Sequence, residues 1–166
     1  MIDLRPFDGE YPLVSVIIPS YQHEPYLAAL FASIEGEVYP NIEVIIIDDG
    51  SMDRSVEFIS VWADRMNGRI PVRWSTRANR GVTATLNDLV AQATGKYVTA
   101  IHTDDYLLPG GLMARVRYLE EHPEKQAVFA DALAIDEKGV EVAGSAIRNI
   151  HGGRPGLPRI RTADVK

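Results

Sequence analysis

The chain has 166 residues, 46% hydrophobic and 24% charged, which are the proportions of a globular protein and exclude an intrinsically disordered one. With 17 Lys and Arg against 23 Asp and Glu, its formal net charge is -6, which argues against a general nucleic-acid binder. The sequence has no Cys, which excludes disulfides, thiolate nucleophiles and Cys-containing zinc sites.

Apolar runs alternate with amphipathic stretches along most of the chain. Short runs rich in β-branched residues predict buried strands at residues 14–18, 43–47, 72–74 and 97–101. Apolar residues at helical spacing predict helices that begin at Pro25, at the N-cap residue Asp53, after Gly81 and at Pro109.

Several details refine this pattern. Pro19 is expected to end the first strand, and Trp62 and Met66, which recur at helical spacing, are expected in the core. Residues 126–134 are predicted to form a further strand, and residues 136–139 a turn.

The alternation of strands and helices predicts an α/β fold with a mostly parallel sheet flanked by helices. We expect residues 1–12 to be a lead-in and residues 13–143 to be one domain. The pattern stops there, so residues 144–166 are expected to be an irregular tail or the start of a region that the chain does not complete. No stretch approaches the ~20 apolar residues that cross a bilayer, and the acidic N-terminus is unlike a signal peptide, which favours a cytoplasmic protein.

Polar side chains follow three of the predicted strands where each strand ends. In an open parallel sheet, ligands bind beyond the carboxyl ends of the strands, so these side chains are candidate ligand groups. The first strand leads into the segment Pro19, Ser20 and Tyr21, with Glu24 close behind. Asp48 and Asp49 follow the second strand, and Asp104 and Asp105 follow the strand that ends at Ile101.

Each acidic pair taken alone is typical of a turn or of a helix start. Two pairs at one rim of the sheet instead favour a functional site, because folding alone does not explain why four carboxylates should gather there. Two like charges about 5 Å apart cost roughly 3 kcal/mol at an effective dielectric of ~20. A cation should relieve that repulsion. Ligands that are all oxygen atoms favour Mg²⁺ or Mn²⁺ over zinc or copper.

Three segments, in this order, resemble the signatures of family 2 nucleotide-sugar glycosyltransferases: VSVIIPSYQHEPYL, NIEVIIIDDGSMDRSVEFI and NRGVTATLNDLVAQATGKYVTAIHTDDYLLPGGL. The resemblance spans roughly residues 13–140, and AVFADALAIDEKG is similar to the strand and hairpin that follow the metal motif in such enzymes. It implies the GT-A fold, a Rossmann-like sheet that binds a nucleoside diphosphate sugar. The chain would be the N-terminal, donor-binding portion, truncated before the acceptor half.

Position by position, the resemblance implies how the nucleoside is held. Pro19, Ser20 and Tyr21 would lie along it, with Tyr21 packed on the base, and Glu24 would sit near the base or ribose. Asp49 would accept a hydrogen bond from the base imide, which suits uracil or thymine better than a purine. The expected donor is therefore a UDP- or dTDP-linked sugar.

The resemblance also implies the diphosphate end of the site. Asn79 and Gly81 would shape the loop beside the base and phosphates, and Asp104 would face the ribose or sugar. Asp105 would hold Mg²⁺ or Mn²⁺ on the diphosphate, where the ion stabilises the charge of the leaving group. His102 stands where the family's metal motif often has its first Asp, and it is expected to be a donor near the ribose or a packed residue rather than a metal ligand.

One expected motif is missing. Inverting family members take their catalytic base from an Asp well after the metal motif, and no match to it lies between Asp131 and Lys166. Asp131 and Asp136 are better explained as turn or surface acids, so the catalytic residue is left unassigned. His23 is expected to be an exposed loop histidine.

The leading hypothesis is a metal-assisted glycosyltransferase that moves a sugar from a UDP- or dTDP-linked donor to a hydroxyl acceptor with inversion, as in cell-envelope polysaccharide synthesis. The alternative is a non-catalytic or incomplete nucleotide-sugar-binding module. A phosphoacceptor receiver domain fits less well, because its acids follow the first strand. Expected partners are the donor and a glycan or small-molecule acceptor, without nucleic acid. Association with a partner protein or with the inner face of the membrane stays open, as does the oligomeric state.

Overall fold

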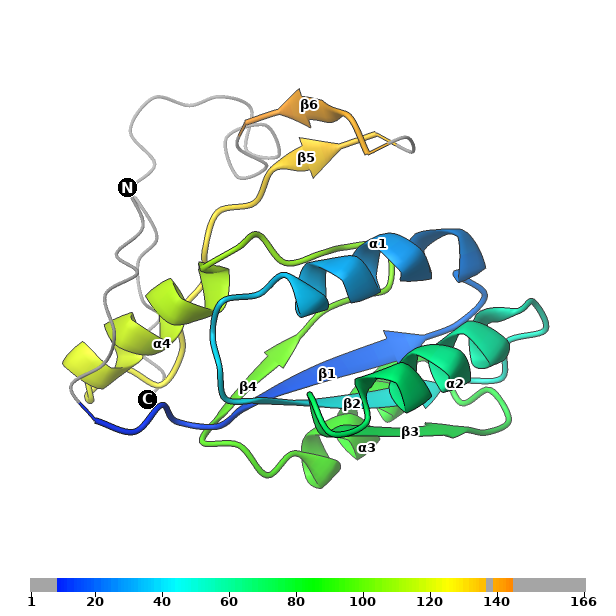
Figure 1. The fold of residues 1–166 in the computed structure, drawn as a ribbon, viewed down its shortest axis with the longest axis horizontal. Helices are drawn as coiled ribbons and strands as arrows, with labels where there is room; N and C mark the ends of the chain where they lie inside the picture. The colour runs from blue at the N-terminus through cyan, green and yellow to red at the C-terminus, as the bar shows by residue number, and fades with distance from the viewer. Residues whose placement is uncertain (1–8, 137–138, 145–166) are drawn as a thin grey trace. The chain divides into compact units, whose positions relative to one another are not determined.

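The computed structural model describes residues 9–136 and 139–144, so most of the 144–166 tail lies outside the described residues. The chain forms two compact units, one up to Met113 and one from Ala114. No helix in the described part of the chain is long and apolar enough to span a membrane. The elements are β1 (Val14–Ser20), α1 (Glu24–Glu35), β2 (Ile42–Asp48), α2 (Ser55–Met66), β3 (Val72–Thr76), α3 (Val82–Gln92), β4 (Tyr97–Ala100), α4 (Gly111–Glu121), β5 (Ala134–Ile135) and β6 (Glu141–Ala143) (Figure 1).

Four parallel strands form the sheet of the first unit, in the order β3-β2-β1-β4. The chain lays down β1, β2 and β3 side by side and then returns to the other side of β1 for β4 (Figure 1). The strand order therefore reverses between β1 and β4. In doubly wound sheets, the carboxyl ends of the strands at such a reversal are where ligands bind.

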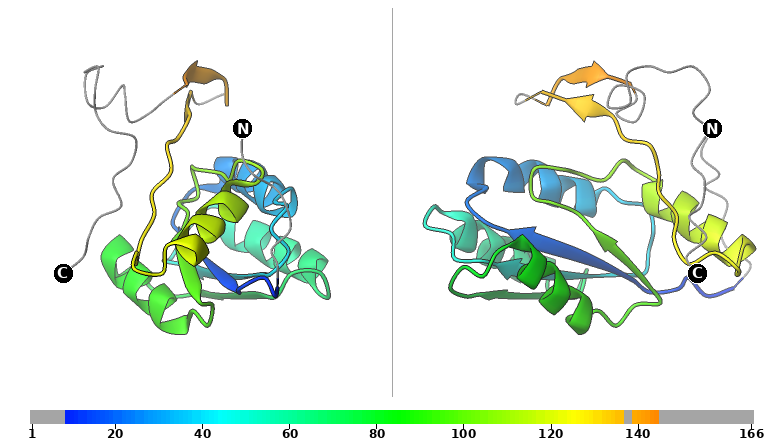
Figure 2. Two further views of the ribbon diagram at one scale, coloured as in Figure 1. Left: turned by 90° about the vertical axis from the view of Figure 1, so that its left-hand side faces the viewer. Right: turned by 180° about the vertical axis from the view of Figure 1, so that it is seen from behind.

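Helices cover both faces of this sheet (Figure 2). α1 and α2 pack together, and the stacked rings of Phe31 and Trp62 lie 4.1 Å apart between centroids. α3 covers the opposite face, where Leu89 packs against Ile17 and Ile47. β1 and β2 are buried along their whole length, which explains their unbroken apolar runs. The predicted α/β fold with a mostly parallel sheet is confirmed.

Pro19 does not end the first strand, contrary to the sequence prediction, and lies within β1 opposite Ile47 of β2. The backbone of Ile17 points toward β4, since its carbonyl accepts the N–H of Ile101 at 3.0 Å. Pro19, two residues further on, faces the same side, where the pairing of β1 with β4 has already ended at Ala100. The missing N–H of proline therefore removes no hydrogen bond from the sheet.

In the second unit, the strand predicted at residues 126–134 is wrong for most of its length. Only Ala134 belongs to a strand, β5, which pairs antiparallel with β6. The rest of the run has no strand pairing within the described chain, and Phe129 is 62% exposed. β-branched and aromatic composition makes a strand only where another strand lies alongside to accept its hydrogen bonds. At the two ends of the predicted turn, the Asp136 carbonyl accepts the N–H of Gly139 at 2.9 Å, and residues 137–138 lie outside the described residues.

A buried network joins the amino ends of the strands. Glu43 of β2 is 7% exposed. Its carboxylate accepts the Ser15 hydroxyl at 2.6 Å, the Thr94 N–H at 2.8 Å and the Arg73 Nη2 at 2.8 Å. Burial works to raise the pKa of Glu43, but these hydrogen bonds outweigh it and lower the pKa to about 2. The network fixes the end of the sheet opposite to the carboxyl ends of its strands.

Candidate functional site

The residues predicted to bind a ligand lie at the carboxyl edge of the sheet, at the ends of β1, β2 and β4. Ser20 and Asp48 are paired as the last residues of β1 and β2. Tyr21 follows β1 directly, and it is 45% exposed, so its ring is available to a planar ligand. The strand geometry thus brings the first two predicted groups of residues to one edge.

Asp48 organises this edge rather than facing a ligand, because it is fully buried and saturated with internal hydrogen bonds. It accepts the backbone N–H of Ser51 at 2.8 Å and that of Gly50 at 3.2 Å. It also accepts the hydroxyls of Ser20 at 3.2 Å and of Thr76 at 3.3 Å. One carboxylate therefore ties together the ends of β1, β2 and β3.

Asp49, its neighbour, binds the loop that precedes α3. Its Oδ1 accepts Arg77 Nε at 2.9 Å, and its Oδ2 accepts the backbone N–H groups of Arg80 at 3.0 Å and Gly81 at 2.7 Å. Burial alone would raise the pKa of Asp49, but the hydrogen bonds from Arg77 and from the two amides lower it below its usual value. Asp49 is therefore held as an ionised acceptor.

Arg77 is a residue of this edge that sequence reasoning missed. Its side chain is 20% exposed and contacts Asp49 and Asp88, and its Nη2 donates to the Thr85 hydroxyl at 2.8 Å. We predicted that a cation relieves the acidic rim and assigned that cation to a metal ion. At Asp49, where the sequence predicted a contact with the base and not with the metal, the positive charge belongs to Arg77. The only signal in the sequence was the charge imbalance itself.

The backbone of this loop has little freedom. Gly50 has φ +88°, and a Cβ on it would lie 3.0 Å from the Arg77 carbonyl oxygen and 3.1 Å from the Asn79 nitrogen. Gly81 has φ +84°, and its N–H also reaches Asn79 Oδ1 at 3.1 Å. Both glycines adopt a conformation that other residues rarely take. The Asn79–Gly81 stretch is therefore pressed against the turn after β2.

Glu24, at the start of α1, is tied to the loop after β2. Its carboxylate accepts the Arg54 backbone N–H at 3.2 Å and lies 3.9 Å from the Arg54 guanidinium. In return, Asp53 accepts the N–H of Glu24 at 3.1 Å and that of Ser55 at 3.0 Å. Asp53 thus satisfies the first turn of α2, as expected for a capping acid, although the helix begins at Ser55.

His23 is not the exposed loop residue that we predicted. It is half-buried and shares a hydrogen bond between its Nδ1 and the Oγ1 of Thr103, a residue 80 positions away that is 1% exposed. The loop after β1 is therefore fastened to the loop after β4 at the point where the strand order reverses. The neighbouring Gln22 has a positive φ of 52° and donates its N–H to Ser51 Oγ at 2.8 Å.

Asp104 and Asp105 remain as the free acidic pair of the edge. Both are exposed, together with His102, whose carbonyl accepts the Asp105 N–H at 3.0 Å in a tight turn. Desolvation, followed by the charge of Asp104, raises the pKa of Asp105, and the nearby His102 opposes this shift. Within residues 9–136 and 139–144, no three His, Asp or Glu side chains cluster as a complete metal site. The expected gathering of four carboxylates is thus reduced to this pair.

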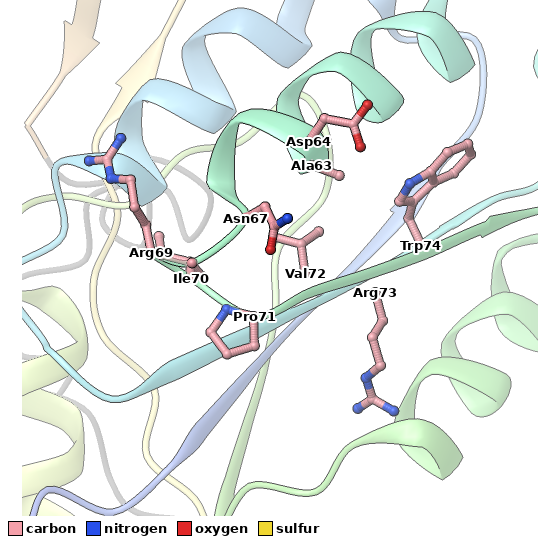
Figure 3. Close-up of a pocket in the computed structure, with 10 residues that line it drawn as sticks. Ala63, Asp64, Asn67, Arg69, Ile70, Pro71, Val72, Arg73 and Trp74 are labelled. Carbon is pink, nitrogen blue, oxygen red and sulfur yellow. The ribbon is translucent and has the colours of Figure 1, made fainter.

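A hollow of about 650 Å³ lies elsewhere, around the connection from α2 to β3 (Figure 3). Its lining runs from Ala63 to Trp74 and includes Asp64, Asn67 and Arg69. It contains none of the predicted site residues and adjoins the amino end of β3. The hollow therefore does not belong to the carboxyl edge.

Comparison with known proteins gives a family for the chain. The model of glycosyl transferase family 2 matches residues 15–158. The putative glycosyltransferase EpsE of Bacillus subtilis (strain 168) is 35% identical over 132 residues, which cover 80% of this chain and 47% of EpsE. The poly(ribitol-phosphate) beta-N-acetylglucosaminyltransferase TarS of Staphylococcus aureus (strain Mu50 / ATCC 700699) is 27% identical over 132 residues, covering 78% of this chain and 22% of TarS. The chain spans less than half the length of these relatives.

Solved structures share the fold. The mannosyltransferase PcManGT from Pyrobaculum calidifontis, in complex with GDP-Man and Mn²⁺, superposes with a TM-score of 0.65 at 24% identity, covering 74% of this chain and 38% of that protein. S. aureus TarS in complex with UDP-GlcNAc has a TM-score of 0.61 at 24% identity, covering 73% of this chain and 36% of the other. These matches confirm the GT-A architecture. Because the family model covers most of the chain and EpsE is more than 30% identical to it, the chain belongs to glycosyl transferase family 2.

Proposed function

We propose that the chain carries the donor site of a glycosyltransferase that moves a sugar from a UDP- or dTDP-linked donor to a hydroxyl acceptor, with inversion and with the help of Mg²⁺ or Mn²⁺. The observation that carries the proposal is the carboxyl edge itself. There, an exposed aromatic ring, an ionised acceptor and a free acidic pair follow three strands of a family 2 sheet: Tyr21, Asp49, and Asp104 with Asp105.

The nucleoside would bind at the ends of β1 and β2. Tyr21 would stack on the base, beside Pro19 and Ser20, and Glu24 would stand near the base or ribose. Asp49 would accept the imide N–H of the base, since its carboxylate is held as an acceptor by the preceding loop. TarS was solved with UDP-GlcNAc, which supports a uridine nucleotide for this site.

The diphosphate would lie between the Asn79–Gly81 loop and the Asp104–Asp105 turn. Two adjacent exposed carboxylates cannot face a pyrophosphate without a cation between them, and desolvation together with the charge of Asp104 raises the pKa of Asp105. Mg²⁺ and Mn²⁺ sites often combine one or two carboxylates with substrate phosphates, which fits a pair rather than a full cluster of protein ligands. PcManGT was solved with Mn²⁺ and GDP-Man, which supports a divalent cation for this site.

In the proposed reaction, the acceptor hydroxyl oxygen attacks the anomeric carbon as the in-line bond to the diphosphate breaks, and the hydroxyl proton passes to a general base that is not assigned among the described residues. The chain's residues bind and orient the donor: Asp49 fixes the base, Asp104 faces the ribose or sugar, and Asp105 holds the ion. When bound, the ion acts as a Lewis acid that stabilises the charge on the departing diphosphate. The proposed acceptor is a hydroxyl of a glycan or small molecule, and TarS is by its name a transferase that acts on poly(ribitol-phosphate).

Isothermal titration with UDP, with and without Mn²⁺, tests the assignment. We expect the wild-type chain to bind UDP in a metal-dependent way, and Asp105→Ala to lose that dependence because the ion loses its carboxylate. The control is Asp64→Ala, which removes an exposed acid from α2 and should bind like the wild type. Equal metal-dependent binding by the wild type and Asp105→Ala would remove Asp105 from the site.

A second candidate is a donor-binding module without turnover. Turnover would need a catalytic base, and the acids that follow Asp104 and Asp105 are bound as turn residues are. Asp131 accepts the N–H of its neighbour Ala132 at 2.9 Å, and Asp136 accepts the Val140 N–H at 2.9 Å. Transfer and hydrolysis assays over a panel of nucleotide sugars separate the two candidates. Metal-dependent turnover by the chain alone would exclude the module.

A further inference from the structure

We infer that Arg77 positions Asp49 for recognition of the donor base and thereby sets the preference among nucleotides. This inference rests on the proposed function, because it assumes that a nucleobase meets Asp49. Arg77 itself touches neither the ion nor the sugar in the proposed site, so its role is to position another residue.

The hydrogen bonds that the Asp49 carboxylate already accepts show why the position of Arg77 affects ligand binding. Each lone pair of a carboxylate oxygen gives one direction from which a hydrogen bond can be accepted. An ionised carboxylate offers about four of them, two on each oxygen. Oδ2 already accepts the N–H groups of Arg80 and Gly81, at 3.0 and 2.7 Å. Oδ1 accepts only Arg77 Nε, at 2.9 Å. The acceptor direction that has no protein partner among the described residues therefore belongs to Oδ1, the oxygen that Arg77 holds, on a side chain that is 5% exposed.

The direction of Arg77 is fixed in turn by α3. Its Nη1 contacts Asp88, and its Nη2 donates to Thr85 Oγ1 at 2.8 Å. The same hydroxyl donates to the Gly81 carbonyl at 3.0 Å, so it is both donor and acceptor. A guanidinium is planar and its N–H groups form a rigid fork, so fixing two nitrogens also fixes the third. Helix α3 thus determines where Oδ1 points.

An acceptor held in this way selects its ligand by the presence of an N–H group. Uracil and thymine present an imide N–H at N3, whereas cytosine presents a bare nitrogen there. A bare nitrogen facing an ionised carboxylate leaves the acceptor unpaired and adds repulsion between the two lone pairs. We expect the wild-type chain to prefer UDP over CDP by ~10-fold or more, as is typical when a hydrogen bond to a charged group is lost.

The test is the ratio of the dissociation constants of CDP and UDP, measured by titration calorimetry with saturating Mn²⁺. The two nucleotides share the ribose and the diphosphate, so the ratio reports the base alone. Arg77→Met removes the fork and keeps an aliphatic stem, and we expect the ratio to fall to ~3 or less, because Oδ1 is no longer aimed. Arg65→Met is the matched control. It removes an arginine that pairs with Glu35 on the other face of the sheet, and it should keep the wild-type ratio.

Two further variants separate positioning from charge and from folding. Arg77→Lys keeps a positive charge without the planar fork, so we expect a reduced ratio; full restoration of the wild-type ratio by lysine would overturn the inference. If Arg77→Met does not fold, as judged by circular dichroism, Asp88→Asn serves in its place. It releases one anchor of Arg77 and should also lower the ratio, and an unchanged ratio would overturn the inference.

The remaining outcomes distinguish this inference from the proposed function. A wild-type ratio that persists in a folded Arg77→Met chain overturns the role of Arg77 and leaves the donor site intact. A wild-type chain that binds neither nucleotide, or binds both equally, contradicts the proposed contact of Asp49 with the base, and the inference fails with it. Only a base preference that is present in the wild type and lost with Arg77 supports it.

Discussion

At the scale of single residues, two adjacent aspartates perform different tasks because of what surrounds them. Asp48 ends β2 and is enclosed by the turn that follows, and its hydrogen bonds all go to the protein. Asp49 points the other way, to the loop before α3, and keeps one acceptor direction. In the sequence the two residues are an indistinguishable acidic pair. Their side chains point in opposite directions because successive side chains alternate along a strand.

We predict that Asp48→Ala destabilises the fold. The substitution leaves the amide groups of Gly50 and Ser51 and three hydroxyls without their shared acceptor, which should cost about 3 kcal/mol of unfolding free energy. Urea unfolding followed by circular dichroism measures the change. The exposed acid of α2 is the control, and Asp64→Ala should stay within about 0.5 kcal/mol of the wild type. A stability equal to that of the control would mean that Asp48 does not organise the edge.

At the scale of elements, buried side chains hold the strands in register at both ends of the sheet. The carboxyl end depends on Asp48, and the amino end depends on Glu43, which joins Ser15 of β1 and Arg73 of β3. Because the folded pKa of Glu43 is lowered from 4.5 to about 2, its ionised form is favoured by folding. Its contribution is complete above pH 4.5 and is lost as the pH falls toward 2.

We therefore predict that Glu43→Gln removes part of the acid sensitivity of the chain. A shift of this size corresponds to about 3 kcal/mol of wild-type stability at neutral pH. Unfolding free energies measured between pH 7 and pH 2 should show the variant and the wild type converging as the pH falls through this range. Glu124→Gln, at an exposed position, should parallel the wild type. A Glu43→Gln curve that also parallels the wild type would contradict the assignment.

Much of the fold could be predicted from the sequence, because β1, β2 and the first three helices carry patterns that depend only on local periodicity. The position of Tyr21, Asp49 and Asp105 just after strand ends follows from the same patterns, whereas their roles stay predictions. The roles of Arg77 and His23 could not be predicted, since their partners Asp49 and Thr103 lie 28 and 80 residues away in the chain. The run at 126–134 resembled a strand, but its pairing depends on a neighbour that no local pattern supplies.

At the scale of the whole molecule, burial and strand pairing differ between the described segments of the chain. The central strands β1 and β2 are buried on both faces, whereas the stretch after α4 is mostly exposed and has no strand pairing up to β5 within the described residues. Backbone amides exchange with solvent according to the free energy of the opening that exposes them. The two regions should therefore differ in protection.

Hydrogen exchange followed by mass spectrometry checks this difference. We expect peptides from β1 and β2 to exchange only through global unfolding, and peptides covering residues 124–133 to exchange close to the rate of an unstructured chain. Peptides from α2 serve as an internal reference for a helix with one buried face. Equal protection of residues 124–133 and β1 would show that the second unit is ordered more firmly than its hydrogen bonds indicate.

The order of strands in the sheet also has a consequence for biosynthesis. β1 can pair with β2 as soon as α1 has formed, but its other neighbour, β4, arrives only after α2, β3 and α3 have been made. The contact between His23 and Thr103 then closes across 80 residues of chain. Pairing over such a separation is slow compared with local structure formation. We therefore expect a growing chain to pair β1 with β2 first and to complete the carboxyl edge only when β4 has docked.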